Sequence, residues 1–529
     1  MSPHWAGAGL LTRAALRRDR VVIGAWYVVL LAVCYASAAA TGSLYPAVAD
    51  RVAAATAINS SPAVVALYGP VLDVSSLGEL SMTKLTVLYA VFVAMLLLVL
   101  VRRHTRTEEE GGQAELLGGT VIGRGAPLAA AVAEATAVSV ALGLLAALVD
   151  VAGGLPLVGS LAFGASWAGV GLVATGLTAV ACQVSASSRT CAAVAAGALG
   201  VLFLVRAVGD TSAGWLSWLS PFGWSTKLHA WSGTRWWVLL LYVAAAVALV
   251  TLAQALRGRR DLGDGILATR PGPTAGSPRL ADALALTLRL HGPMVLTWSV
   301  AIGLAGLVLG SIAPNIGSML DSPAARDMIE RLGGRGALED TLISAELSVV
   351  AVIVTCFGIA VVGHGGTEER DGRTEQVLAT PTSRSRSFVA TLTVALAGSA
   401  WLLVVAGLTM TVGYGTAAGR LGEAWSRVLP AALVQAPAVW LVTAITVAAY
   451  AVRGRWSVLG WAFLVGFLTL GQLGELLRLP TWVVQASPYV HVPKMPVEPF
   501  SAGPPLVLTA LAAALLVAAW ARYRSRDIG

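Results

Sequence analysis

Residues 82–109 read MTKLTVLYAVFVAMLLLVLVRRHTRTEE, and residues 342–369 read LISAELSVVAVIVTCFGIAVVGHGGTEE. In each stretch a run of about 20 mostly apolar residues, long enough for a helix to cross a membrane, precedes His and Thr-Glu-Glu. At a constant offset of 260, the first acidic segment (104–124) and the second acidic segment (364–384) share eight of 21 residues without a gap. A charged segment repeated after two apolar runs predicts two related halves.

Composition places the chain among membrane proteins. Hydrophobic residues make up 57% of the 529 positions, charged residues only 12%, and the mean hydropathy is +0.76. A single soluble domain could not bury that much apolar surface, and helices satisfy their backbone polar groups across many separate spans. We therefore predict an all-α polytopic membrane protein with about 12 transmembrane helices in two homologous six-helix halves. The apolar runs lie near residues 21–40, 82–101, 127–149, 161–183, 191–208, 236–255, 294–313, 342–362, 388–413, 430–452, 456–473 and 505–521.

Positive charge sets the predicted orientation. With the N-terminus inside the cell and the spans alternating, 24 of the 36 Lys and Arg residues fall in inner segments, and cytoplasmic loops favour basic residues. Both termini are then cytoplasmic. The other interpretation of the +8 net charge, a nucleic-acid interface, would need basic residues gathered on one soluble face. We predict no nucleic-acid partner.

The clearest boundary lies between the halves. Residues 257–277 are rich in Arg, Gly, Pro and Asp, which is typical of a linker. We predict a first half at 1–256, a cytoplasmic linker at 257–278 and a second half at 279–529. Ahead of the first span, residues 7–20 mix leucines with arginines, which predicts an interfacial helix rather than a cleavable signal peptide.

Cysteine and basic-residue usage bear on the compartment. The four cysteines lie in or beside apolar runs without metal-ligand spacing, so we predict neither a disulfide nor a metal site. Arg outnumbers Lys by 33 to 3, a composition typical of a GC-rich bacterial genome. The expected location is a bacterial plasma membrane, crossed many times.

The acidic segments predict a short cytoplasmic structure after the second span of each half. Thr107 can cap a new helical turn whose Glu108 and Glu109 face its positive N-terminal end. A second turn would follow at Glu115. The alternative is a solvated loop whose charges only keep it out of lipid, and repetition in both halves argues against that.

The second acidic segment carries a family pattern. Glu-Glu, Gly, Glu-x-hydrophobic-hydrophobic, small residues, Thr-Pro and Ser-Arg follow one another from Glu368 to Arg384. This resembles the type-2 ABC exporter permeases, and the fused six-plus-six chain is similar to permeases of actinobacterial antibiotic exporters of the polyketide and tetronasin type. The first segment departs from the pattern at Gly118 and Gly119. The resemblance implies a helix that docks on an ATPase, with ATPase-coupling roles for Thr107, Glu108, Glu109, Glu115, Thr367, Glu368, Glu369 and Glu375.

The same resemblance implies a function. The chain would be the permease subunit of an ATP-driven ABC exporter that moves lipophilic or amphipathic compounds, such as antibiotics and drugs, out of the cell. It has no Gly-x-x-x-x-Gly-Lys-Ser/Thr phosphate loop, so we do not expect it to be an enzyme or to bind a cofactor. ATP and Mg would bind to two copies of a separate ABC ATPase subunit. Membrane lipid and a hydrophobic small-molecule substrate are the other expected partners.

Two outer segments also match. Ser220-Pro221-Phe222 follows the fifth span and Ser487-Pro488-Tyr489 the eleventh, at an offset of 267. The resemblance implies short outer re-entrant helices that close the pathway, formed around Trp215, Trp218, Pro221 and Pro488. The alternative is an ordinary aromatic belt at the headgroup level.

The resemblance further implies that the second and fifth spans of each half line the substrate pathway. Tyr89, Phe92 and Phe357 are then candidate substrate contacts. Any apolar span would offer similar side chains for packing, and this alternative stays open.

A proton- or sodium-coupled secondary transporter with duplicated halves is the main alternative function. It requires ionisable groups at membrane depth, and Glu134 in the third span is the best example. Its register partner is Val394, so we interpret Glu134 as a packing or snorkelling group. His104 and His364 stand at the inner ends of their spans, where imidazole meets the helix dipole, which indicates a structural role. A multipass enzyme is a third possibility, resting on acidic residues within 321–340.

Overall fold

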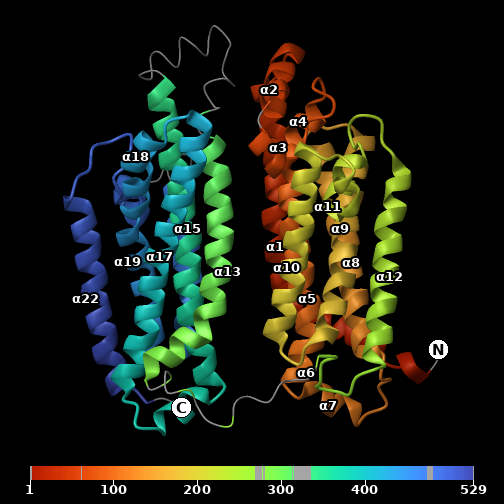
Figure 1. Cartoon of the computed structure of the whole chain (residues 1–529). Helices are drawn as coiled ribbons and strands as arrows, with labels where there is room; N and C mark the ends of the chain where they lie inside the picture. Colours follow the sequence, from red (N-terminus) through yellow and green to blue (C-terminus); the bar gives the residue numbers. More distant parts are fainter. Residues whose placement is uncertain are drawn as a thin grey trace. The chain divides into compact units, whose positions relative to one another are not determined.

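The computed structural model describes residues 3–60, 62–267, 274, 277, 280, 282–312, 314, 335–473 and 480–527. The acidic residues at 321–330 lie outside them. Every regular element in the described residues is a helix, which confirms the predicted all-α class. The chain divides into two compact units, Met1–Gly272 and Pro273–Gly529, each a bundle of long helices (Figure 1).

The first unit contains helices α1 to α12. Short 3-10 and π turns connect some of them. The helices are α1 (Ala8–Leu44), α2 (Val48–Ser60), α3 (Pro62–Tyr68), α4 (Leu77–Lys84), α5 (Ala90–Arg102), α6 (Glu108–Glu110), α7 (Gln113–Gly118), α8 (Ala126–Ala152), α9 (Leu157–Val184), α10 (Ser188–Thr211), α11 (Pro221–Lys227) and α12 (Leu239–Arg257).

The second unit contains helices α13 to α22. Its helices are α13 (Ala283–Ile312), α15 (Arg335–Arg370), α16 (Arg373–Leu378), α17 (Arg384–Ala418), α18 (Leu421–Leu433), α19 (Ala436–Val452), α20 (Leu459–Leu473), α21 (Thr481–Val484) and α22 (Gly503–Ser525).

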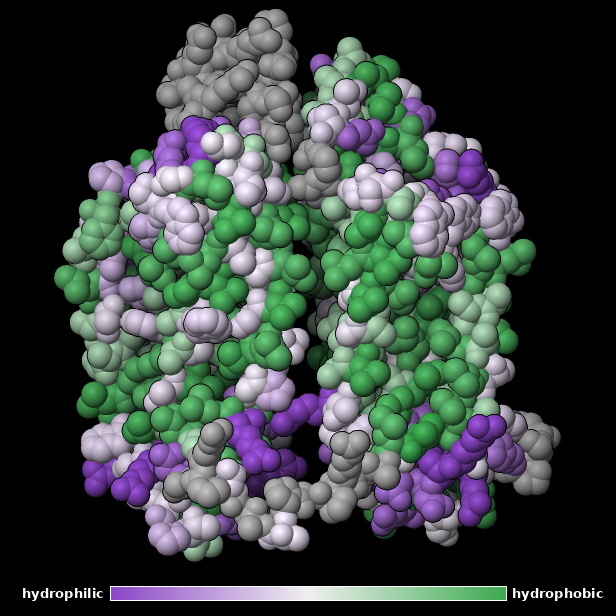
Figure 2. Space-filling view, in the orientation of Figure 1, coloured by the Kyte–Doolittle hydropathy of each residue, from purple (hydrophilic) through white to green (hydrophobic). Residues whose placement is uncertain are grey.

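The apolar runs form the long helices. Among the described residues, eleven helices are long and apolar enough to span a membrane, and a shorter apolar helix, Gly454–Leu468, occupies the place of the remaining predicted span. Hydrophobic side chains cover the flanks of each bundle, while hydrophilic ones gather at its ends (Figure 2). This distribution is that of a multi-pass membrane protein.

The predicted interfacial helix is not a separate element. Residues 8–20 belong to α1, which continues without a break to Leu44. An α-helix of 37 residues is about 55 Å long at 1.5 Å per residue, well beyond the roughly 30 Å of hydrocarbon. Leucine, alanine and arginine are all good helix formers, so the helix continues through the arginines and their charge marks no boundary.

Helix pairing is the same in the two units. In the first unit α1 packs on α8, α5 on α9, and α9 on α12. In the second unit α13 packs on α17, α15 on α19, and α19 on α22. The first span therefore contacts the third, the second contacts the fourth, and the fourth contacts the sixth in both bundles, as expected for a duplicated architecture.

Small residues permit the closest of these contacts. A Cβ atom added to Gly143 of α8 would lie 2.4 Å from the carbonyl oxygen of Gly164 in α9, and one added to Gly164 would lie 2.1 Å from that of Gly143. Glycine at both positions lets the two backbones touch, as is common where membrane helices associate through van der Waals packing.

Candidate functional site

The first acidic segment continues the second span. After α5 the chain passes through a π turn at Arg103–Thr107 directly into α6, and Thr107 has helical φ and ψ with no capping hydrogen bond. The predicted cap at Thr107 is therefore wrong. Its hydroxyl instead lies 2.9 Å from Ser188 Oγ, so the residue connects the segment to the start of α10.

The turn that redirects the chain lies five residues later. Gly112 has φ of +73° and precedes α7. Gly372 has φ of +70° and precedes α16. Most side chains avoid this left-handed conformation, which explains why glycine occupies both positions. The helices α7 and α16 begin and end at the same offset of 260, so the repeated residues adopt the same local structure.

The corresponding threonine of the second copy lies within a helix. α15 runs through Thr367 to Arg370, and the Thr367 hydroxyl donates to the carbonyl of Gly363 at 3.2 Å. This is the bond of a mid-helix threonine to the preceding turn. The cap prediction failed at Thr107 because a π turn carries the span past it, and regular helix carries the second copy past Thr367.

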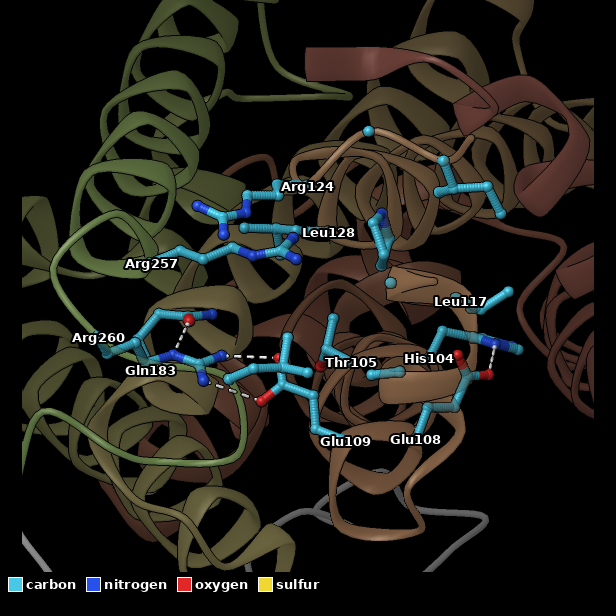
Figure 3. Close-up of a pocket in the computed structure, with 16 residues that line it drawn as sticks. His104, Thr105, Glu108, Glu109, Leu117, Arg124, Leu128, Gln183, Arg257 and Arg260 are labelled. Carbon is cyan, nitrogen blue, oxygen red and sulfur yellow. Dashed lines mark hydrogen bonds and ion pairs between the residues drawn. The ribbon is translucent and has the colours of Figure 1, made fainter. Parts of the chain in front are cut away.

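The glutamate pair of the first segment is held by arginines. Glu109 contacts the fully buried Arg106, and its oxygens accept from Arg260 at 2.8 and 2.9 Å. Arg260 also donates to Gln183 Oε1 at 2.8 Å, and Figure 3 shows it lying between Gln183 and Glu109. Glu108 contacts Arg18 of α1. Glu108 and Glu109 therefore both form their ion pairs within the first unit.

The second segment repeats part of this arrangement. Glu369 pairs with Arg526, which follows α22, just as Glu109 pairs with Arg260, which follows α12. Glu368 lies 3.1 Å from His364 Nε2. In each unit the second glutamate therefore connects the acidic segment to the residues after the sixth span.

The short helices carry the exposed side chains. Glu115 and Glu375 are exposed, and Leu116 is 78% exposed. A cavity of about 230 Å³ lies beside α7, with leucines at 117 and 128 and arginines at 124 and 257 among its walls (Figure 3). A partner approaching this end would meet the short helices before the glutamate pairs.

A buried cluster at the base of the first segment was not foreseen. His104 Nε2 lies 2.8 Å from Asp19 Oδ2 and 3.3 Å from Glu134 Oε2. Asp19 and Glu134 have no exposed surface, and His104 is only 6% exposed. Glu134 therefore does not snorkel. Asp19 is 85 residues from His104 in the sequence, and no spacing rule links them.

The candidate substrate contacts separate into two groups. Tyr89 is half-buried and Phe92 exposed, and their rings lie 5.5 Å apart. Phe357 is fully buried and packs edge-on against Trp298 at 5.8 Å. Within its unit Phe357 is a core residue, which supports the packing interpretation there.

Short helices form at both predicted outer segments. Pro221 begins α11, and Pro488 begins a 3-10 helix at Pro488–His491. Both prolines are buried. Trp215 is 66% exposed, whereas Trp218 stacks on Trp237 at 5.6 Å. Their re-entrant role stays a prediction.

Comparison with known proteins identifies relatives. Residues 280–524 match the family model described as the C-terminal domain of the multidrug efflux system permease Rv1217c. The chain is 40% identical, over 535 aligned positions, to the multidrug efflux system permease protein Rv1217c of Mycobacterium tuberculosis, and the match covers 100% of this chain and 97% of the relative.

Proposed function

Since the chain belongs to the family of the Rv1217c multidrug efflux permeases, we propose that it is the membrane permease of an ATP-driven ABC exporter, served by two copies of a separate ATPase. Its cargo would be lipophilic or amphipathic compounds, including drugs, moved outward across the plasma membrane. ATP and Mg would bind to the ATPase subunits.

The repeated short helix carries the proposal. α7 and α16 share their boundaries and their left-handed glycine at the offset of 260. A second surface of the same shape suits a second copy of the same partner. Each surface combines an exposed carboxylate with neighbouring apolar groups, the mixture found where proteins dock reversibly.

The ion pairs suggest how a docked partner would move the bundle. Glu109 connects the first segment to Arg260 after α12, and Glu369 connects the second to Arg526 after α22. Up to Glu110 and Arg370, each segment also continues its second span as a helix. Displacement of a short helix would therefore act on the second and sixth spans of its unit together.

Copurification of the full chain from its host tests the proposal. We expect an ATP-binding partner at two copies per permease and transport into inside-out vesicles that requires ATP. The double variant Glu115→Lys and Glu375→Lys should lose the partner while the permease still inserts, because both carboxylates are exposed. Glu498→Lys, exposed on the connection between the last two spans, is the matched control.

Two results would refute the proposal. One is transport that persists without ATP and follows a proton or sodium gradient, as the secondary-transporter alternative requires. The other is a working complex in which both short helices contact no partner protein.

A further inference from the structure

The cluster of Asp19, His104 and Glu134 brings three metal-ligating side chains together from three elements. Asp19 comes from α1, His104 from the π turn after α5, and Glu134 from α8. One donor atom of each lies within 4.8 Å of the others. The 3.3 Å from the imidazole nitrogen to Glu134 is the separation of two ligands at about 2.0–2.2 Å from a tetrahedral ion, and the 2.8 Å hydrogen bond to Asp19 would have to lengthen by about 0.5 Å to admit one.

Glu134 supplies an independent indication. It has no exposed surface, and neither carboxylate oxygen has a hydrogen-bond partner among the described residues. A buried carboxylate without hydrogen bonds is costly unless a cation or a proton neutralises it. Its Oε2 atom faces His104 Nε2, so the unsatisfied group is directed into the cluster.

The charges of the surroundings favour a bound cation. The glutamate and aspartate carboxylates at 19, 108 and 134 are accompanied by two guanidinium groups, Arg18 on Glu108 and Arg103 on Asp19 Oδ1 at 2.7 Å. With a neutral imidazole the cluster then carries one excess negative charge. Arg103 occupies the oxygen of Asp19 that faces away from His104, and the other oxygen remains available to an ion.

The second ring nitrogen of His104 is arranged as in many metal sites. Nδ1 lies 3.1 Å from Glu108 Oε1 and 2.7 Å from Arg18 Nη2. Without an ion, Arg18 can donate to Nδ1 while Nε2 donates to Asp19. With an ion on Nε2, the proton moves to Nδ1 and donates to Glu108, the outer-shell carboxylate that orients a ligating imidazole.

The cluster borders two cavities through its histidine. Two cavities, of about 230 and about 320 Å³, both have His104 and Glu108 in their walls. We propose that Asp19, His104 and Glu134 bind a divalent transition-metal ion of the zinc or manganese class, which pins the first, second and third spans together beneath the first acidic segment. Imidazole with carboxylates suits these ions.

The second unit provides an internal control. At a common offset of 272, Trp26 corresponds to Trp298 and Asp19 to His291, and the rings of His291 and His364 lie 5.1 Å apart. Val394 stands in the register of Glu134. The second unit has thus replaced both carboxylates of the cluster, and the proposal places the ion in the first unit alone.

Metal binding to the purified full-length permease tests this directly and does not depend on any ATPase. After removal of metal with a chelator, the protein is titrated with Zn²⁺ and Mn²⁺ by calorimetry, with bound metal counted by mass spectrometry. Co²⁺ binding is followed by visible absorption. We expect one tightly bound ion per chain.

Variants separate ligation from folding. His104→Ala and Glu134→Val should lose the ion, and valine is the residue that the other half uses at that register. Glu108→Gln should weaken binding by about 10- to 100-fold, the usual effect of removing an outer-shell partner. His364→Ala should bind as the wild type does. The proposal is overturned if the wild type binds no ion, if His104→Ala binds equally well, or if His364→Ala loses the ion as well.

Discussion

The two acidic segments share a turn and a short helix, but the residues that support them inside each bundle differ. Each follows its second span, turns at a left-handed glycine and forms a short helix at the offset of 260. Beneath the first lies a buried aspartate and glutamate around His104. Beneath the second, His364 meets His291, and Val394 replaces the glutamate. The turn and the short helix are therefore the same in both copies, whereas the residues that support them inside the bundle differ.

This difference separates two kinds of constraint. The turn and the short helix are retained where a repeated partner would dock, whereas the interior has only to hold them in place. An interior can do so with ion pairs or with apolar packing, provided that buried charges are paired. We therefore expect α7 and α16 to be alike in shape, while the interiors that support them differ in stability.

The largest expected difference concerns the second glutamate of each pair. Glu109→Gln leaves both Arg106 and Arg260 without a carboxylate, and removal of one partner from a buried ion pair costs about 3–5 kcal/mol. Glu369→Gln removes the carboxylate partner of Arg526 alone. Thermal unfolding of the purified variants should show a clearly greater loss for Glu109→Gln.

Aromatic contacts give a reason for that ranking. The guanidinium of Arg526 also lies over the rings of Tyr450 and Tyr523, at 5.2 and 4.9 Å from their centroids. Cation–π contacts stabilise a desolvated arginine. Arg526 therefore keeps two favourable contacts when Glu369 is changed. Equal losses of thermal stability in Glu109→Gln and Glu369→Gln would contradict the proposed difference between the two interiors.

The next prediction compares helix contacts in the corresponding third spans. Gly143→Ala places a methyl group against a backbone carbonyl of α9 that cannot move by itself, and should cost about 3 kcal/mol, at the upper end for overpacking. Gly407→Ala in α17 meets the side chain of Leu429 at 2.8 Å and Ala432 Cβ at 2.9 Å. Leu429 can rotate, and the contact with Ala432 is longer than the 2.4 Å contact of Gly143 with backbone, so a smaller loss is expected by the same unfolding measurement. A larger loss for Gly407→Ala would reverse the argument.

The fold was largely predictable because the lipid environment restricts it. Long apolar runs must become helices in a membrane, and those runs, together with the repeat, indicated two six-helix halves. Local chemistry at the segment ends was less predictable. Threonine before two glutamates is a common cap. At Thr107, however, a π turn connects α5 to α6 without an interruption at which the threonine could act as a cap.

Contacts between distant residues explain what the sequence could not reveal about the site. Asp19 meets His104 only because α1 and the end of the second span lie together. Arg260 and Arg526 bind the glutamates from segments that look like ordinary basic flanks of a span. The repeat showed that the two acidic segments are copies of the same local structure. The side chains that each copy contacts inside its bundle depend on tertiary packing, which the sequence does not reveal.

Substitution of exposed residues on the short helices should change the affinity for the ATPase and leave the stability of the permease unchanged. The expected difference between the two units is smaller here. Leu116 is 78% exposed, and its register partner is the exposed Gln376. If α7 docks on an ATPase, Leu116→Ser should weaken the complex by about 10- to 100-fold, since burying a leucine contributes about 1.5–3 kcal/mol. Gln376→Ser should change affinity little. Titration of the permease with the copurified ATPase measures both, and unchanged affinity for Leu116→Ser would remove α7 from the interface.

The smallest expected effect is also the one in which the two halves should agree. Gly112→Ala and Gly372→Ala each force an alanine into a left-handed turn, at a cost of about 1–2 kcal/mol. Neither position has an atom within 4 Å of the added Cβ. Backbone strain therefore accounts for the full loss of stability, which does not depend on the residues that support the turn. Limited proteolysis should show similar loosening of both short helices. Unequal loosening would mean that the different interiors of the two units also affect the turns, which would contradict this prediction.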